Sequence, residues 1–236
     1  MIELVIFDFD DTLIDNIKMD YQSFVIPCRE LGIHMIPFTE IVKFRKNGLK
    51  AKEIIDILLK EENQKDLLQK FVEIREKFLA EPRSFRFLKL KNNVQNFLEL
   101  LKQNSIRCIL CSSRENKNKI IDFLKEENVF DYFSTVLNRD DISVNIDNRN
   151  DLDRLFIKNV LIRRILKFEN INPAHILYIG NAMEDFVIAE NMKMNFICFQ
   201  NYYLKENEFS DVLKVNTMEG LIEEFKKLNV QGEIKN

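Results

Sequence analysis

The sequence predicts an α/β protein with a doubly wound parallel sheet and an all-helical domain inserted after the first strand. From about residue 94 onward, short apolar segments that favour β-structure alternate with segments of helical periodicity. This is the pattern of parallel strands joined by crossover helices. Between about residues 16 and 85, only helical spacing is found. We therefore expect a core domain formed by residues 1–15 and 86–236, and a helical domain formed by residues 16–85.

The first strand is predicted at Leu4–Phe7, an apolar segment that runs into Asp8, Asp10 and Thr12. Carboxylates inside a core are costly unless they are paired or hold a cation, so we expect these at the strand's carboxyl end. Ligands of open parallel sheets bind at that edge. Strand alternation puts Asp8 and Asp10 on one side. Two acids placed in this way can share a divalent metal, or act as nucleophile and proton donor.

The inserted segment is predicted to contain four helices, because apolar residues recur there every three to four positions. Gly32 ends the first helix, Thr39 caps the second, and Pro82 closes the last. The second half of the chain then continues the alternation of strands and helices. Further strands are predicted at Ile106–Cys111, Phe133–Leu137, Ile176–Ile179, Phe196–Phe199 and Val212–Val215, and further helices near 94–101, 120–124, 155–168, 184–192 and after Thr217.

Charge and composition exclude several classes of function. The net charge is −3, and basic residues are interspersed among acids, so neither a nucleic acid nor an anionic membrane is expected as partner. No uncharged stretch approaches the roughly 20 residues of a membrane span, and the start lacks the basic region of a signal peptide. Cys108 and Cys111 match a redox or zinc half-motif, but a strand would point them to opposite faces. We expect core thiols and a cytoplasmic protein, either a monomer or a homodimer.

Polar residues end three of the predicted strands, and in a parallel sheet these ends lie on one rim. The first strand ends in the acids described above, and a lysine precedes the third of these strands. Carboxylates, hydroxyls and a lysine on one rim predict a site for a phosphorylated or otherwise anionic substrate. The residues concerned are Asp8, Asp10, Thr12, Ser112, Ser113, Lys158, Gly180, Asn181 and Asp185.

These residues resemble the four motifs of the haloacid dehalogenase superfamily, whose members are mostly magnesium-dependent phosphohydrolases. Asp8-Phe-Asp10-Asp-Thr12 is similar to the first motif, and Ser112 and Lys158 to the second and third. The fourth motif, Gly-Asp-x-x-x-Asp, is matched by Gly180-Asn181-Ala-Met-Glu-Asp185. The resemblance spans the whole chain. The helical block lies where the family carries a helical cap, as in the phosphoglycolate phosphatase and β-phosphoglucomutase branch, whose core is Rossmann-like.

The resemblance implies a Mg²⁺-dependent phosphatase that hydrolyses a small phosphate monoester through an aspartyl-phosphate. Its substrate would be a small phosphorylated metabolite, chosen by the cap as it closes over the rim. Asp8 would be the nucleophile, and Asp10 would move the protons. The resemblance also implies that the substrate is bound by Thr12, Ser112, Ser113 and Lys158, with Thr12 holding local geometry. It implies that the metal is bound by Asp8, Asp10, Asn181 and Asp185.

One position departs from the family pattern. Asn181 stands where the family usually has a metal-binding Asp, so the site has one negative charge fewer. Two alternatives therefore stay open beside the phosphatase. One is a phosphomutase that acts on a sugar phosphate, and the other is a non-catalytic binding protein that kept the fold. A haloacid dehalogenase is disfavoured, because its first motif lacks the second Asp, and Asp10 is present here.

Overall fold

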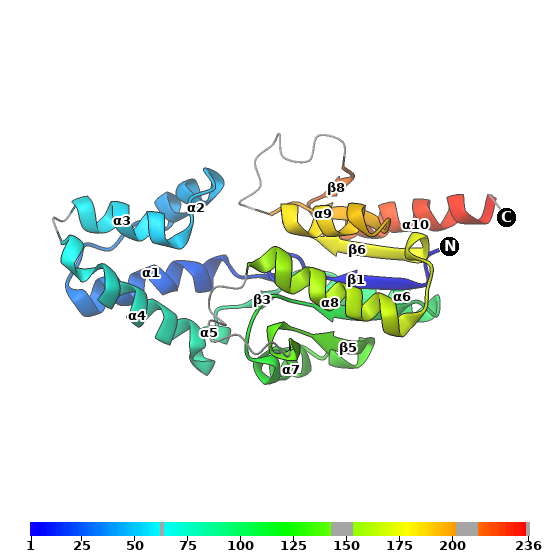
Figure 1. Cartoon of the computed structure of the whole chain (residues 1–236), viewed down its shortest axis with the longest axis horizontal. Helices are drawn as coiled ribbons and strands as arrows, with labels where there is room; N and C mark the ends of the chain where they lie inside the picture. Colours follow the sequence, from blue (N-terminus) through cyan, green and yellow to red (C-terminus); the bar gives the residue numbers. More distant parts are fainter. Residues whose placement is uncertain (62–63, 143–152, 202–211, 235–236) are drawn as a thin grey trace. The chain divides into compact units, whose positions relative to one another are not determined.

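The computed structural model describes residues 1–61, 64–142, 153–201 and 212–234 (Figure 1). The chain divides into two compact units. One contains Met1–Ile14, Leu90–Asn201 and the C-terminal segment, and the other contains Asp15–Lys89. The short strands β2 (Ile14–Asp15) and β3 (Lys89–Leu90) pair with each other where the chain passes from one unit to the other and back. The limits of 16 and 85 for the helical domain stay a prediction.

The first unit is built on a six-stranded sheet with the order β5-β4-β1-β6-β7-β8. Every neighbouring pair is parallel, which confirms the predicted fold class. The first strand, β1, lies between β4 and β6, so the chain adds strands first on one side of β1 and then on the other. Such a switch point is where ligands bind in open α/β sheets. The strands are β1 (Leu4–Phe7), β4 (Arg107–Cys111), β5 (Phe133–Leu137), β6 (Ile176–Gly180), β7 (Asn195–Phe199) and β8 (Lys214–Val215).

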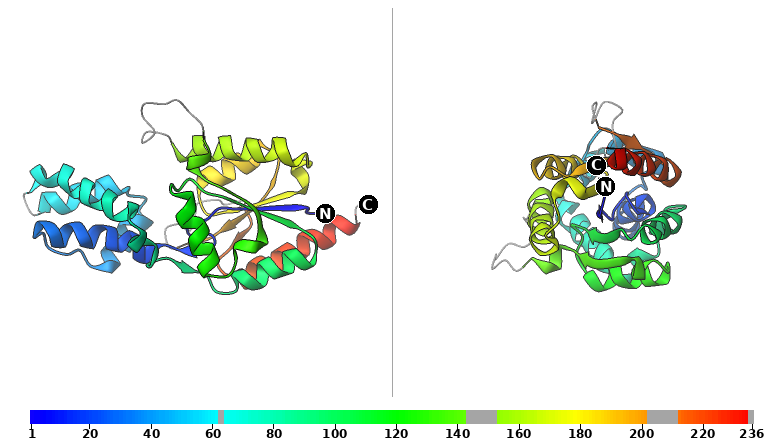
Figure 2. Two further views of the ribbon diagram at one scale, coloured as in Figure 1. Left: turned by 90° about the horizontal axis from the view of Figure 1, so that it is seen from below. Right: turned by 90° about the vertical axis from the view of Figure 1, so that its right-hand side faces the viewer.

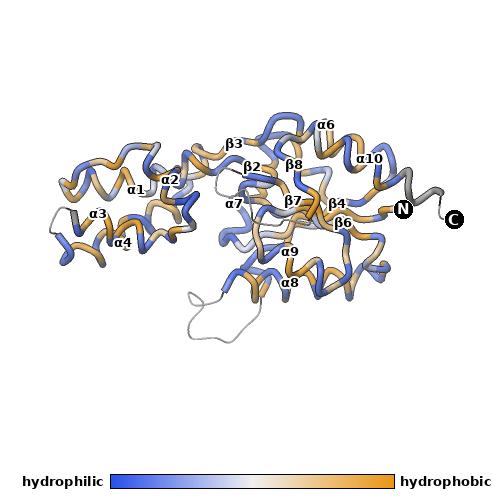
Figure 3. Tube along the Cα trace, turned by 90° about the horizontal axis from the view of Figure 1, so that it is seen from above, coloured by the Kyte–Doolittle hydropathy of each residue, from blue (hydrophilic) through white to orange (hydrophobic). Residues whose placement is uncertain are grey.

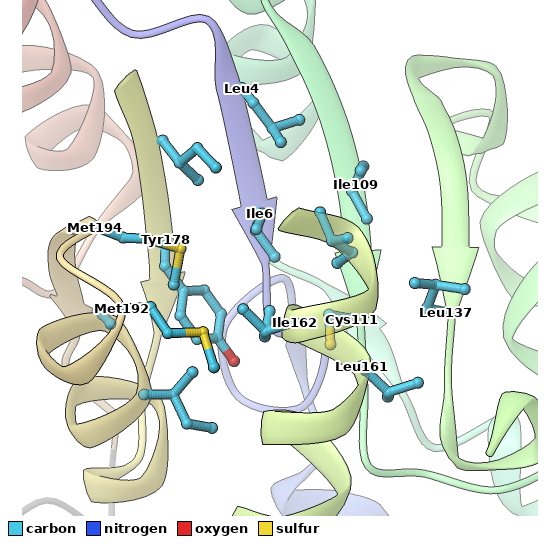
Figure 4. Close-up of a cluster of buried hydrophobic side chains, with 14 of the residues drawn as sticks. Leu4, Ile6, Ile109, Cys111, Leu137, Leu161, Ile162, Tyr178, Met192 and Met194 are labelled. Atoms are coloured by element: carbon cyan, nitrogen blue, oxygen red, sulfur yellow. The ribbon is translucent and has the colours of Figure 1, made fainter. Parts of the chain in front are cut away.

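Helices cover both faces of this sheet (Figure 2, left). Leu4 and Ile6 point to one face, where they pack with buried side chains of α8 and α9, such as Ile162 (Figure 4). Phe7 points to the other face and meets Phe97, which in turn contacts the last helix. The sheet is thus buried on both sides, as the apolar strands predict. The helices are α6 (Val94–Gln103), α7 (Lys117–Glu126), α8 (Arg154–Glu169), α9 (Met183–Asn191) and α10 (Met218–Ile234).

Between residues 16 and 85, all the regular secondary structure that the structure describes is helical, and turns join the helices. Its core contains Phe24, Ile41, Ile54 and Phe71. The prediction that Thr39 caps the second helix is wrong, because that helix begins at Phe38 and the extended backbone of Pro37 leads into it. The helices are α1 (Ile17–Leu31), α2 (Phe38–Lys46), α3 (Ala51–Glu61), α4 (Leu68–Ala80) and α5 (Pro82–Phe85). Short 3₁₀ helices lie at Lys65–Leu67, Phe130–Tyr132, Arg139–Asp141 and Pro173–His175.

Apolar residues concentrate in the strands and on the inner sides of the helices (Figure 3). All four cysteines are buried and none is in a disulfide, so they are core thiols, as expected. Burial raises the pKa of the Cys108 thiol to about 12, which keeps it protonated at neutral pH. In the described part of the chain, no helix combines the length and the apolar character needed to cross a membrane.

Candidate active site

Asp8 lies directly after the central strand, with only 3% of its surface exposed. Its backbone N–H donates to the carbonyl of Ile179 at 2.9 Å, which fixes it against the neighbouring strand β6. Alternation along β1 directs its side chain to the face on which Leu4 and Ile6 lie. That face is covered by α8, and the Asp8 carboxylate meets a cation from this helix.

The chain turns sharply after Asp8. Asp11 has a left-handed backbone with φ of 58°, a conformation that Asp tolerates better than most residues. The N–H of Leu13 donates to the carbonyl of Phe9 at 3.1 Å and closes the turn. As a result, the Thr12 hydroxyl donates to Asp8 Oδ2 at 3.2 Å. Thr12 therefore holds one oxygen of the buried carboxylate.

Lys158 bridges two buried carboxylates. It comes from the sheet-facing side of α8 and is 4% exposed. Its Nζ lies 2.6 Å from Asp8 Oδ1 and 2.6 Å from Asp185 Oδ1. Shielding from water strengthens the attraction between the lysine and its two carboxylate partners, and removal of any one of the three would leave a buried charge uncompensated.

Asp185 sits in the first turn of α9 and is fully buried. Its Oδ1 accepts from Lys158 and from the hydroxyl of Tyr178 at 2.6 Å. Its Oδ2 accepts from the backbone N–H groups of Asn181 and Ala182, each at 3.1 Å. Both of its oxygens are therefore occupied by protein donors.

Gly180 allows this arrangement. A Cβ at this position would lie 2.5 Å from Asp185 Oδ2, which is closer than Cβ atoms in proteins come to a non-bonded atom. The absence of a side chain at the end of β6 is therefore needed for Asp185 to fold back toward Lys158.

Burial dominates the electrostatics of Asp8. It raises the pKa of this carboxyl group to about 7, against the attraction of Lys158 and with added repulsion from Asp185 and Asp10. Burial alone would lower the pKa of Lys158, but Asp185 and Asp8 outweigh it and the pKa is raised. At neutral pH the site therefore holds a charged lysine and a carboxyl group close to its own midpoint.

Asp10 is more exposed than Asp8 and pairs with Arg114. The guanidinium contacts both carboxylate oxygens, with Nε at 3.1 Å from Oδ2 and Nη2 against Oδ1. It also lies over the ring of Phe9, 6.0 Å from the centroid. A two-pronged arginine contact favours the ionised form of Asp10 and fixes its orientation.

The two serines after β4 differ in their surroundings. Ser112 is buried, and its Oγ accepts from the N–H of Arg114 at 3.1 Å, so it shapes the turn that places this arginine on Asp10. Ser113 is partly exposed, and its side chain makes no hydrogen bond within the ranges that the structure describes.

Residues 5–199 match the model of the family of haloacid dehalogenase-like hydrolases. This range runs from the first strand to β7 and includes every predicted site residue. The chain belongs to this family. The predicted resemblance is thereby confirmed, as is its membership of a class of hydrolases.

Solved structures of haloacid dehalogenase-like proteins share the fold over nearly the whole chain. A hydrolase of this family from Streptococcus pneumoniae is 18% identical, with a TM-score of 0.68 over 94% of this chain and 97% of the other. A predicted phosphoglycolate phosphatase from Haemophilus somnus is 15% identical, with a TM-score of 0.69 and the same coverage of both chains. A candidate β-phosphoglucomutase from Thermotoga maritima is 19% identical, with a TM-score of 0.68 over 96% and 99%. No curated protein matches the chain.

The fold thus brings together most of the residues that the sequence pointed to. Asp8, Thr12, Lys158 and Asp185 are joined by direct contacts. Two contributors were missed. No role is predicted for Arg114 from the sequence, although an arginine two positions after the second motif is a usable signal. Tyr178 lies inside an apolar strand, where nothing in the sequence marks its hydroxyl.

The haloacid dehalogenase-like pattern also implies a Mg²⁺ ion, and the side chains do not fit one as they are arranged. Within the residues that the structure describes, no three or more His, Cys, Asp or Glu side chains are grouped so that they could hold a metal. Asp185 has no oxygen left to offer. In the orientation in which the Asn181 amide forms hydrogen bonds with its protein neighbours, its nitrogen donates to Asp8 Oδ2 at 3.2 Å and to the Asp10 carbonyl at 3.3 Å. A hard cation needs oxygen ligands, whereas these two oxygens face an N–H donor.

Proposed function

We propose that this protein is a phosphatase that hydrolyses a small phosphate monoester through an aspartyl-phosphate on Asp8. The observation that carries the proposal is the buried Asp8 carboxylate at the carboxyl end of the central strand, with Lys158 on one oxygen and Thr12 on the other. Membership of the haloacid dehalogenase-like hydrolases supports it. The proposed substrate is a small phosphorylated metabolite. A cytoplasmic location and a monomeric or homodimeric state stay predictions.

In the first step, an oxygen of Asp8 attacks phosphorus and the bond to the leaving oxygen breaks. A carboxylate is ionised above its pKa without the help of a base, so the main obstacle is repulsion between it and the phosphate. Lys158 reduces this repulsion, because its charge lies 2.6 Å from Asp8 Oδ1. Asp10 must carry a proton at this step, against the preference that Arg114 gives to its ionised form, and it donates that proton to the leaving oxygen.

In the second step, water attacks the phosphoryl group, and Asp8 is released together with inorganic phosphate. Asp10, now ionised, takes a proton from that water. The contact with Arg114 favours this form of Asp10, and it keeps the carboxylate in place between the two steps. Ser112 supports the turn that carries Arg114, and is proposed to bind a phosphoryl oxygen together with Ser113.

One observation favours a second candidate, a haloacid dehalogenase-like protein that binds its ligand without turnover. Asn181 occupies the usual Asp position, and its amide faces the oxygens that a metal would need. The phosphatase and the binding protein make opposite predictions for a simple assay.

The test is release of phosphate from an aryl phosphate, measured over a wide range of Mg²⁺ concentrations and in EDTA. We expect turnover, and we expect Asp8→Asn to lower it by a factor on the order of 10⁴ or more, because the nucleophile is lost. Asp122→Asn is the matched control, since Asp122 is exposed on α7. The absence of turnover at every Mg²⁺ concentration would favour the binding protein.

A further inference from the structure

Asn181 contacts both parts of the first motif. Its amide forms hydrogen bonds with these neighbours in one of its two orientations, in which the nitrogen donates to Asp8 Oδ2 at 3.2 Å and to the Asp10 carbonyl at 3.3 Å, and the oxygen accepts from the Asn201 amide. This orientation follows from the neighbours. The opposite orientation would press the amide oxygen against two acceptors and the nitrogen against a donor.

The two oxygens that Asn181 contacts are expected metal ligands. The resemblance to the haloacid dehalogenase superfamily implies that the first motif offers a cation one oxygen of the Asp8 carboxylate and the backbone carbonyl of Asp10. A primary amide carries an oxygen, which can ligate a cation, and two N–H donors, which cannot. In this chain the donor side faces both oxygens, so the amide satisfies the same groups that a metal would satisfy.

The charges around the site point the same way. When Asp8 is ionised, Asp8, Asp10 and Asp185 contribute three negative charges, and Lys158 and Arg114 contribute two positive ones. Among these five side chains, one negative charge is left. An Asp at position 181 would make it two, which a divalent cation would balance. With Asn181, the need for such a cation is smaller.

We propose that the Asn181 amide takes the place of a divalent cation in the resting site. Its N–H groups bridge Asp8 and the Asp10 carbonyl, so a cation binds only when the amide gives up these hydrogen bonds and moves aside. The inference rests on the proposed function for the roles of Asp8 and Asp10, and on the family resemblance for the identity of the two ligand oxygens. It makes Asn181 a competitor of the metal and not one of its ligands.

The test is direct binding of Mn²⁺, used as a spectroscopic substitute for Mg²⁺ and followed by electron paramagnetic resonance, with no substrate present. We expect weak binding by the natural chain, and binding tighter by about tenfold or more in Asn181→Asp, which adds a carboxylate. Asn181→Ala is the decisive variant. If the amide competes with the cation, removing it leaves the affinity for Mn²⁺ equal or higher.

Three results would overturn the proposal. One is a loss of Mn²⁺ affinity of about tenfold in Asn181→Ala, which would make the amide oxygen a ligand. Another is equal affinity in the natural chain and Asn181→Asp, and the third is no binding even by Asn181→Asp. If Asn181→Ala does not fold, Asn181→Asp still decides, because an affinity equal to that of the natural chain would contradict the competition.

Asn195 offers a matched control. Its side chain also donates to two carbonyls, those of Ala174 and Ile176. It lies at the start of β7, however, and so at the amino-terminal ends of the strands, whereas the site lies at their carboxyl ends. Asn195→Ala should leave Mn²⁺ binding unchanged. Binding of Mn²⁺ tests this inference, and release of phosphate tests the phosphatase proposal. Because the two assays are separate, failure of one proposal can be distinguished from failure of the other.

Discussion

Each unit of this haloacid dehalogenase-like protein contains a cluster of three charged side chains, in which one central side chain forms ion pairs with two others. The central side chain is a cation in one unit and a carboxylate in the other. In the sheet unit, the cation of Lys158 lies between the carboxylates of Asp8 and Asp185. In the helical unit, the carboxylate of Asp20 lies between two guanidinium groups. The sheet cluster has an excess of negative charge, and the helical cluster has an excess of positive charge.

The two clusters also differ in burial and in what they join. The three side chains of the sheet cluster are at most 6% exposed, and those of the helical cluster are 14–18% exposed. Arg45 from α2 and Arg75 from α4 converge on Asp20 in α1, and both lie over the ring of Phe24. This cluster therefore ties three helices together. The sheet cluster instead holds a carboxylate whose charge is disfavoured, which suits a nucleophile better than a structural tie.

The largest expected difference concerns the central cation. Lys158→Met removes the only charge between two buried carboxylates of the sheet cluster, so we expect it to lower the free energy of unfolding by about 3–5 kcal/mol. Arg75→Met should lower it by only about 1 kcal/mol, because Asp20 keeps Arg45. Urea unfolding followed by circular dichroism measures both. Equal losses would mean that the two clusters play the same structural role.

The raised pKa of Asp8 predicts a pH dependence. The Asp8 carboxyl group is mostly neutral in the folded state up to about pH 7, and in the unfolded state only up to its ordinary pKa of 3.8. The Asp8 carboxyl group therefore stabilises the folded state below its unfolded-state pKa, and this stabilisation is lost as the pH rises through its folded-state pKa. The difference in unfolding free energy between Asp8→Asn and the natural chain should grow in favour of the variant from pH 4 to 7, to a few kcal/mol. A difference that stays constant would contradict the raised pKa.

A smaller effect is expected from geometry alone. Gly180→Ala keeps every charge but places a Cβ 2.5 Å from Asp185 Oδ2, so we expect a loss of about 1–3 kcal/mol and a weaker contact of Asp185 with Lys158. Gly220→Ala is the matched control in α10, where the nearest atom lies at 3.4 Å. It should be neutral or stabilising by up to about 1 kcal/mol. Thermal melting of both variants makes the comparison.

The sheet cluster could be predicted from the sequence, and the helical cluster could not. Asp8, Lys158 and Asp185 follow strand ends or precede them at recognisable offsets, and parallel topology brings such positions to one rim. Asp20, Arg45 and Arg75 lie on separate helices with ordinary solvent-facing patterns. Helical periodicity gives the face on which a residue lies, but not which helices pack together or which charges meet between them.

The same limit explains what was missed within the site. The sequence indicated that Asn181 departs from the family pattern, but the direction of its amide depends on Asp8, Asp10 and Asn201, which come from separate segments. Arg114 reaches Asp10 only because the turn after β4 carries it there. The type and approximate position of the strands of the six-stranded sheet and of the longer helices were predictable, but the short elements β2, β3 and α5 were not predicted. Contacts between side chains from different segments were not.

The nucleophilic role of Asp8 is tested most directly by trapping the intermediate. The protein is mixed with an aryl phosphate, quenched in acid within milliseconds to seconds, and examined by intact mass and peptide mapping. We predict a gain of one phosphoryl group on the peptide that contains Asp8. The adduct should be absent in Asp8→Asn and should accumulate in Asp10→Asn, because Asp10 is needed for its hydrolysis. Release of phosphate with no phosphoryl group on Asp8, or with the group on another residue, would contradict this role.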